Sequence, residues 1–241
     1  MGLFQKIFGK NGALEGDFEQ GSKTDFDSFS QLLMREGIFS LQKQKALDKI
    51  VQGLNWSVDA NSALIYFGNE LAFPIQAFGH FTFEDSAWKW AWSEPQSRQS
   101  IASLREANKL HKIGTQKGIP ELSTPHFRTD KTFLQQIGLV AAAYAPYAAP
   151  FALNYGKGAM LVTVETARLA TETRPAKVLC QLINEFTHQY KSNHQEAVFN
   201  YFVDLGLALR RSDTAIEARY QNGLIRARFN DKGSLKGIDC R

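Results

Sequence analysis

The chain has 241 residues, of which 44% are hydrophobic, 22% charged and 12% aromatic, with 18 glycines, 7 prolines and 2 cysteines. These values exclude a collagen-like fibre, a disulfide scaffold and a disordered chain, and the length suits one large domain or two small ones. A chain this long buries about 70–75% of its unfolded surface, so it can fold without a metal or a disulfide. We therefore expect a soluble globular protein that needs no cofactor and no metal.

The net charge is +4, which is too small to indicate nucleic-acid binding by itself. Its distribution is uneven, because residues 1–88 sum to −4, residues 89–131 to +4, residues 132–209 to zero and residues 210–241 to +4. Basic segments of this kind are usually solvated faces. The alternative is that they bind an anionic ligand or partner.

The N-terminal residues 1–25 are predicted to be a flexible segment, because residues 9–25 are rich in glycine and acidic residues. Residues 1–10 lack the pattern of a secretory signal, and their amphipathic turn and a half is too short to bind a membrane well by itself. The uncharged stretch 132–156 contains Pro146 and Pro150 and is rich in alanine, so no transmembrane segment is expected.

In the first half of the chain the apolar spacing changes from helical to alternating. A helix is predicted from Phe26 to Leu33, followed by an interruption at Gly37. A second helix then has Leu47, Ile50, Val51 and Leu54 on one face. Residues 63–67, 71–83 and 88–92 then have the pattern of an antiparallel meander, whose long middle strand alternates over its whole length between an apolar and a polar face.

The second half of the chain is predicted to hold four helices and two hairpins. One helix starts near Pro95 and ends at Gly114, a loop covers residues 114–128, and a second helix is capped by Asp130. A hairpin follows over residues 151–165, then a helix from Pro175 to Tyr190. Ser192 and Gln195 form a predicted capping box for the last helix.

Near the C-terminus, Asn222-Gly223 lies between two alternating segments and predicts a β-hairpin with a two-residue loop. This register pairs Tyr220 with Ile225 and places six apolar side chains on one face. On the other face it sets Glu217 opposite Arg228, and Arg219 opposite Arg226. Two facing arginines repel unless an anion lies between them. We therefore consider, as an alternative function, the binding of an anion or of nucleic acid by Arg219, Arg226 and Arg228 beside Arg210 and Arg211.

The predicted fold class is α+β, with a mainly antiparallel sheet (meander plus hairpins) packed against several helices. Residues 26–241 are expected to form a single domain, with a division into two helix-plus-meander halves, 26–128 and 129–241, as the alternative.

The run Trp88-Lys89-Trp90-Ala91-Trp92 is the most unusual feature of the sequence. In a strand, its three indoles lie on one face, where they either cover the core or form the wall of a site for an apolar or aromatic ligand. In the second case, His80 and Arg98 are the candidate polar groups of the site, whose ligand is an unidentified small molecule or protein.

The block from Gly79 to Leu104, with Thr82, the Trp-x-Trp-Ala-Trp run and Pro95, resembles an uncharacterised bacterial domain family of unknown function. In that family the run is usually followed by Asn, whereas Ser93-Glu94 follows it here. Weaker agreement extends over residues 45–205. The resemblance implies a bacterial, cytoplasmic protein and supplies no activity.

Catalytic and metal signatures are not found, so a non-catalytic binding or interaction domain is favoured and the enzyme question stays open. No dinucleotide, P-loop, HExxH or GxSxG motif is present. The alternative is an enzyme that uses His80 with Glu84 or Glu94. Glu185-x-x-His188 occurs once, whereas a di-iron bundle needs it twice, so we interpret it as a surface pair.

The two cysteines, Cys180 and Cys240, are 60 residues apart and lack zinc spacing. Cys180 lies among apolar residues, which suggests a buried reduced thiol. Reduced thiols are typical of the cytoplasm, so a cytoplasmic location is expected.

Overall fold

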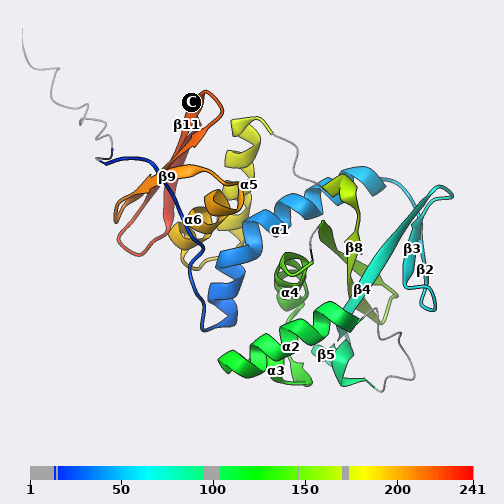
Figure 1. The fold of residues 1–241 in the computed structure, drawn as a ribbon. Coiled ribbons are helices and arrows are strands. Elements are labelled where there is room, and N and C mark those ends of the chain that lie inside the picture. The colour runs from blue at the N-terminus through cyan, green and yellow to red at the C-terminus, as the bar shows by residue number, and fades with distance from the viewer. Residues whose placement is uncertain (1–13, 15, 95–103, 146, 170–173, 241) are drawn as a thin grey trace, which may run out of the picture.

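A computed structural model describes residues 14, 16–94, 104–145, 147–169 and 174–240, and Figure 1 shows their arrangement. In these residues two antiparallel sheets lie on either side of a long central helix, α1 (Phe29–Val51). The α+β class with mainly antiparallel sheet is therefore confirmed. Arg98 and the predicted helix in residues 1–10 lie outside the described residues, as does the start of the helix predicted near Pro95.

The larger sheet contains seven strands from the first two thirds of the chain. Its order is β2-β3-β4-β5-β6, with β8 on β4 and β7 on β8. The strands are β2 (Trp56–Asp59), β3 (Leu64–Phe67), β4 (Leu71–Thr82), β5 (Ala87–Trp90), β6 (His126–Arg128), β7 (Ala148–Asn154) and β8 (Gly158–Glu165). The sequence did not reveal β2 and β6. The expected alternation along β4 breaks at a register shift between Ala77 and Gly79, where Phe78 is fully buried.

The smaller sheet has the order β1-β9-β10-β11-β12. Its strands are β1 (Glu19–Gln20), β9 (Ala208–Arg211), β10 (Ala215–Tyr220), β11 (Gly223–Phe229) and β12 (Leu235–Cys240). The segment predicted to be flexible is bound here over part of its length: Glu19 pairs with Leu209, and the backbone N–H of Thr24 donates to Asn200 Oδ1 at 2.9 Å. Strands β7 and β8 follow residue 128 in the chain, yet they are part of the same sheet as β2–β6. A division of the chain at residue 128 therefore does not separate the two sheets.

The helices pack on one another and on the two sheets. Besides α1 they are α2 (Arg105–Lys117), α3 (Pro120–Ser123), α4 (Lys131–Ala143), α5 (Ala176–Gln189) and α6 (His194–Asp204). One core cluster takes side chains from α1, α4, α5, α6 and both sheets, and a smaller one lies between the C-terminal part of α1 and strands β3, β4, β7 and β8. Among the described residues no helix has the length and hydrophobicity required to cross a membrane.

Three predicted helix boundaries are wrong. Two glycines that were expected to end or interrupt a helix lie inside one, and one helix has a different N-cap residue. Gly37 lies inside the continuous α1, where the Phe186 ring covers it. Gly114 likewise lies inside α2 beneath Leu122, and the helix ends at Gly118, whose φ is +67°. The N-cap of α6 is Asn193, which accepts from the N–H of Glu196 at 3.2 Å, in place of Ser192.

The C-terminal hairpin has the predicted apolar face but a different register. Tyr220 pairs with Gly223, so the loop consists of Gln221 and Asn222, and Gln221 takes a φ of +54°. Each residue of β10 therefore faces a partner two positions earlier in β11 than expected. Arg219 faces Leu224, and Glu217 faces Arg226, which removes the predicted repulsion between two arginines.

The expectation of free thiols is also wrong. Cys180 on α5 and Cys240 on β12 form a disulfide, with Cα atoms 6.7 Å apart, and no described cysteine is free. The sequence places them far apart, and only the packing of β12 on α5 brings them together. The cytoplasmic expectation therefore loses the support that it took from reduced thiols.

Candidate functional site

The tryptophan run lies mostly in the core. Trp88 and Trp90 have no exposed surface and meet edge to face at 5.4 Å between ring centroids. The Trp90 indole N–H donates to the backbone O of Glu121 at 3.0 Å, which satisfies its buried polar atom. These two indoles are therefore not the wall of an open site. They are part of the core, which was the alternative interpretation of the run.

Trp92 leaves the strand because a short 3₁₀-helix, Ala91–Ser93, begins after Trp90. Its partly buried indole stacks on the His111 ring of α2, with centroids 3.8 Å apart and planes 10° from parallel. The expected row of three equivalent indoles is thus broken, and Trp92 holds α2 against the end of β5.

His80 lies in a polar row that crosses three strands of the larger sheet. The register sets His80 of β4 opposite Lys89 of β5, and Lys89 opposite His126 of β6. Lys89 forms an ion pair with Glu94 at 2.5 Å. Burial lowers the pKa of His80, while the charge of Glu94 opposes this shift. Of the two carboxylates considered, Glu94 is therefore the one that acts on His80, and Glu84 is exposed.

The C-terminal arginines are engaged by the protein itself. Arg210 and Arg226 bind the two oxygens of the buried Glu217, at 2.8 and 3.3 Å. Arg228 pairs with Asp239 at 2.5 Å. Arg219 lies over the Phe18 ring, 4.4 Å from its centroid. Because these side chains already have partners, the structure does not support an anion site made by Arg219, Arg226 and Arg228.

Glu185 and His188 behave as surface residues. Glu185 pairs with Lys45 of α1 at 2.8 Å, and His188 is exposed. Among the described residues no group of three or more His, Cys, Asp or Glu side chains could hold a metal ion.

An interior ion cluster was not predicted from the sequence. The ammonium of Lys23 bridges Glu36 and Asp204, at 2.5 and 2.7 Å. Lys43 is buried nearby and donates to the backbone O of Ala142. Burial lowers the pKa of Lys43 to about 8 and raises that of Asp204 to about 6. Because Lys23, Glu36 and Asp204 are already paired with one another, we interpret the cluster as structural.

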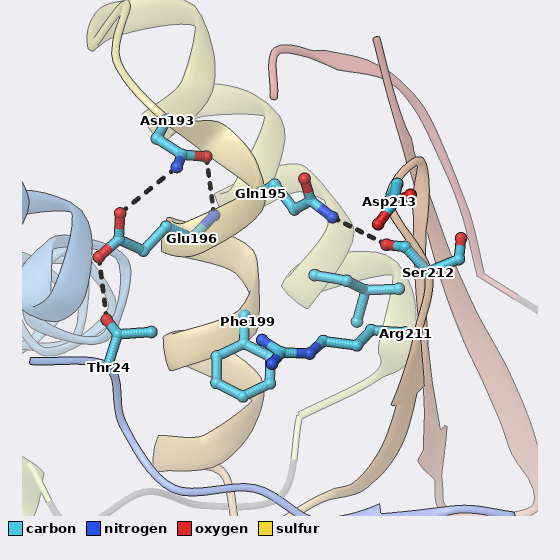
Figure 2. Close-up of a pocket in the computed structure, with 9 residues that line it drawn as sticks. Thr24, Asn193, Gln195, Glu196, Phe199, Arg211, Ser212 and Asp213 are labelled. Carbon is cyan, nitrogen blue, oxygen red and sulfur yellow. Dashed lines mark hydrogen bonds between the residues drawn. The ribbon is translucent and has the colours of Figure 1, made fainter. Parts of the chain in front are cut away.

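A groove of about 540 Å³ lies between the N-terminal half of α6 and the turn that joins β9 to β10. We call it the α6 groove. Three segments distant in sequence form it, since Thr24 closes one side (Figure 2). Its lining residues are Thr24, Asn193, Gln195, Glu196, Phe199, Arg211, Ser212, Asp213 and Ile216.

Hydrogen bonds hold both sides of the α6 groove in place. Glu196 accepts from the Thr24 hydroxyl at 2.9 Å and from the Asn193 amide at 3.4 Å. Across the groove, the Gln195 amide donates to the backbone O of Ser212 at 3.0 Å. The polar lining is therefore ordered before any ligand binds, which lowers the entropic cost of binding.

Arg211 is the cation of the α6 groove. Its guanidinium lies over the Phe199 ring, 4.7 Å from the centroid, and extends from the strand side toward α6 (Figure 2). It forms no ion pair with a described carboxylate. An arginine stacked in this way presents its N–H donors edgewise, in the geometry that binds a carboxylate or phosphate. The sequence pointed to Arg211 only as one member of a basic cluster.

The comparisons with known proteins identify a family but no activity. Residues 30–166 match DUF6882, described as a family of unknown function. This confirms the expectation of such a family, and the match covers more than half of the chain. No curated protein and no solved structure matches.

Proposed function

We propose a ligand-binding function for this chain, which belongs to DUF6882, a family of unknown function. The site is the α6 groove. The ligand is a small zwitterion, such as an amino acid or the end of a peptide, whose carboxylate binds Arg211. The observation that carries the proposal is the guanidinium of Arg211, stacked on Phe199 and without an ion pair to a described carboxylate.

The charges around the groove support a zwitterion over a simple anion. Arg211 supplies one positive charge, whereas Glu196 and Asp213 supply two negative charges on the facing helix and on the turn. These two carboxylates would repel a purely anionic ligand. A ligand with an ammonium group beside its carboxylate gains from both signs, and the groove's amides and hydroxyls can bind the remaining polar atoms.

The position of the groove in the chain limits what the proposal covers. All of its lining residues lie outside residues 30–166, which the family match spans. The proposed binding therefore belongs to the part of this chain that is folded around β9–β12 and α6, and it is not extended to the family as a whole.

The test is a titration with defined zwitterionic probes, alanine and glycyl-alanine, followed by NMR and calorimetry. We expect shifts of the backbone signals around Asn193 and Arg211. Arg211→Gln should weaken binding at least about tenfold, because a hydrogen bond to a charged group contributes about 1.5–3 kcal/mol.

The matched control is Arg219→Gln, which removes an arginine that also lies over a phenylalanine ring but outside the groove. This variant should bind the probes as the wild type does. The proposal is wrong if neither probe shifts the groove signals, or if the two arginine variants lose binding equally.

A further inference from the structure

Exposed apolar side chains gather on one hairpin of the larger sheet. Six large hydrophobic residues are exposed in the described part of the chain, and four of them lie on the β2–β3 hairpin or at its start. They are Leu54 at 42%, Trp56 at 39%, Val58 at 37% and Tyr66 at 37%. Trp56 and Val58 lie on one face of β2, whereas Tyr66 pairs with Ser57 and so lies on the opposite face. Scattered single exposures are common, but two large apolar side chains side by side on an edge strand indicate an interaction surface.

Strand β2 forms an edge of this sheet, since β3 is its one partner among the described strands. Exposed edges are usually protected by lysine, proline or a bulge. Residues 50–73 contain no lysine, arginine or proline, and β2 pairs with β3 in an unbroken register from Trp56 to Asp59. This edge therefore lacks lysine, proline and a bulge, and its remaining protection is its short length and the charge of Asp59.

The backbone groups that face the open edge can be identified. The N–H of Gly68 donates to the carbonyl of Asn55 at 2.8 Å, so the backbone groups of Asn55 point toward the β3 side. Backbone direction alternates along a strand, so Ser57 and Asp59 also point toward β3. The N–H and C=O groups of Trp56 and Val58 therefore point toward the open edge, where β2 has no described partner.

We propose that two copies of this chain associate through antiparallel pairing of their β2 strands, about a two-fold axis at Ser57. In this register Trp56 of one copy lies opposite Val58 of the second copy, and the two residues exchange both of their backbone hydrogen bonds. The two-fold axis repeats the exchange on the other side of Ser57. The interface is isologous, so it closes after two copies and does not propagate into a fibre.

The side chains support a second copy as the occupant. Each Trp56 meets a β-branched Val58, which is a favourable cross-strand pair. Asp59 lies opposite the neutral Asn55, so no like charges face each other. The Asp59 carboxylate is also engaged within its own turn, where it accepts from the Ser62 hydroxyl at 2.6 Å and the Asn61 N–H at 2.9 Å.

The short strand implies a reversible dimer. Interfaces smaller than about 1,200 Å² are typical of weak and transient complexes. Sedimentation velocity of the full chain between about 1 and 200 μM should therefore show a mass that rises from monomer toward dimer, as expected for a micromolar Kd. A wild-type chain that stays monomeric over this range overturns the proposal.

The variant that tests the edge is Val58→Lys, which places a charge opposite Trp56 of the second copy. It should be monomeric at every concentration. The control is Tyr66→Lys, which adds the same charge at a side chain of equal exposure on β3, away from the edge. It should dimerise as the wild type does, and circular dichroism should show both variants folded. Dimers that persist in Val58→Lys contradict the proposal.

The register has its own test by cysteine cross-linking. Ser57 lies opposite Ser57 of the second copy, at a separation that permits a disulfide in an antiparallel pair. Ser57→Cys should therefore give a covalent dimer under mild oxidation. Asp59→Cys should not, because its counterpart lies on the far side of the axis. Equal cross-linking of both variants overturns the register and with it the proposal.

Discussion

Single side chains in this protein take their roles from partners that are distant in sequence. The buried Trp90 donates its indole N–H to the carbonyl of Glu121, and the buried Glu217 is neutralised by Arg210 and Arg226. Arg211 follows Arg210 directly but faces the other side of the sheet, where it lies on Phe199. Arg210 and Arg211 are adjacent and of the same type, but they have different contacts because they lie on opposite faces of the sheet.

His194 is a buried histidine with both ring nitrogens bonded. Its Nδ1 accepts from the N–H of Leu235 at 3.0 Å, so its Nε2 must carry the proton donated to the backbone O of Tyr190 at 2.8 Å. This arrangement requires a neutral ring. Burial lowers the pKa of His194 below its ordinary value of 6.5.

We predict that His194 stabilises the protein only where it is neutral. Its contribution to the free energy of unfolding should be complete above about pH 6.5 and lost as the pH falls through the lowered pKa, because the unfolded chain then binds the extra proton. His194→Gln should cost about 1–3 kcal/mol at pH 7.5 and less at pH 5, measured by urea unfolding.

The control for this pH dependence is His188→Gln, since His188 is exposed on the neighbouring helix. Its unfolding free energy should follow that of the wild type at both pH values. A cost of His194→Gln that is equal at pH 7.5 and pH 5 would show that the ring is not held neutral by its two partners.

At the scale of single elements, helix α1 shows how packing overrides a local signal. Glycine in a helix interior is unfavourable by about 0.5–1 kcal/mol relative to alanine. Gly37 nevertheless lies in the middle of α1, because Phe186 of α5 occupies the space that a Cβ atom would need. The glycine permits close approach of the two helices and does not end one of them.

We predict that Gly37→Ala destabilises the protein despite the better helix propensity of alanine. Overpacking of a core contact costs about 1–3 kcal/mol, which exceeds the gain in propensity. Chemical unfolding measures the net loss. In a Phe186→Leu background, which removes the obstructing ring, the same substitution should cost less. An unchanged cost in that background would exclude Phe186 as the cause.

The sequence predicts an element well where the contacts that determine it are local, and poorly where they join residues that are distant in sequence. Asp130 caps α4 as expected, and the alternating apolar faces of β10 and β11 are correct, because both follow from local pattern. The register between β10 and β11 was wrong by two residues, because local pattern did not show that Glu217 lies between Arg226 of β11 and Arg210 of the third strand, β9. The α6 groove was not predicted because its three segments converge only in the folded chain.

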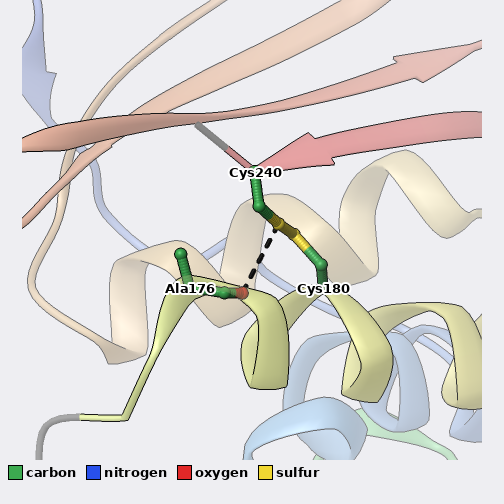
Figure 3. The surroundings of a disulfide bond; sticks show 3 residues. All are labelled: Ala176, Cys180 and Cys240. Atoms are coloured by element: carbon green, nitrogen blue, oxygen red, sulfur yellow. Dashed lines mark hydrogen bonds between the residues drawn. A yellow bond between two sulfur atoms is a disulfide. The ribbon is translucent and has the colours of Figure 1, made fainter.

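At the scale of the whole molecule, long-range links join the smaller sheet to the rest. Lys23, which follows β1, bridges Glu36 of α1 to Asp204 of α6. The disulfide between Cys180 and Cys240 fastens the last described strand to α5, and Figure 3 shows the two side chains meeting beneath the end of β12. Cys240 Sγ also contacts the backbone O of Ala176 at 3.4 Å.

The last prediction concerns this disulfide. Because it closes a span of 60 residues, we expect that the oxidised protein is more stable than the Cys180→Ser/Cys240→Ser variant by about 2–4 kcal/mol in guanidinium unfolding. Cys240→Ser alone should lose as much as the double variant, since either change breaks the same bond. Native protein purified without reductant should react with no thiol reagent. Two reactive thiols, together with equal stability of all three proteins, would show that the bond does not form.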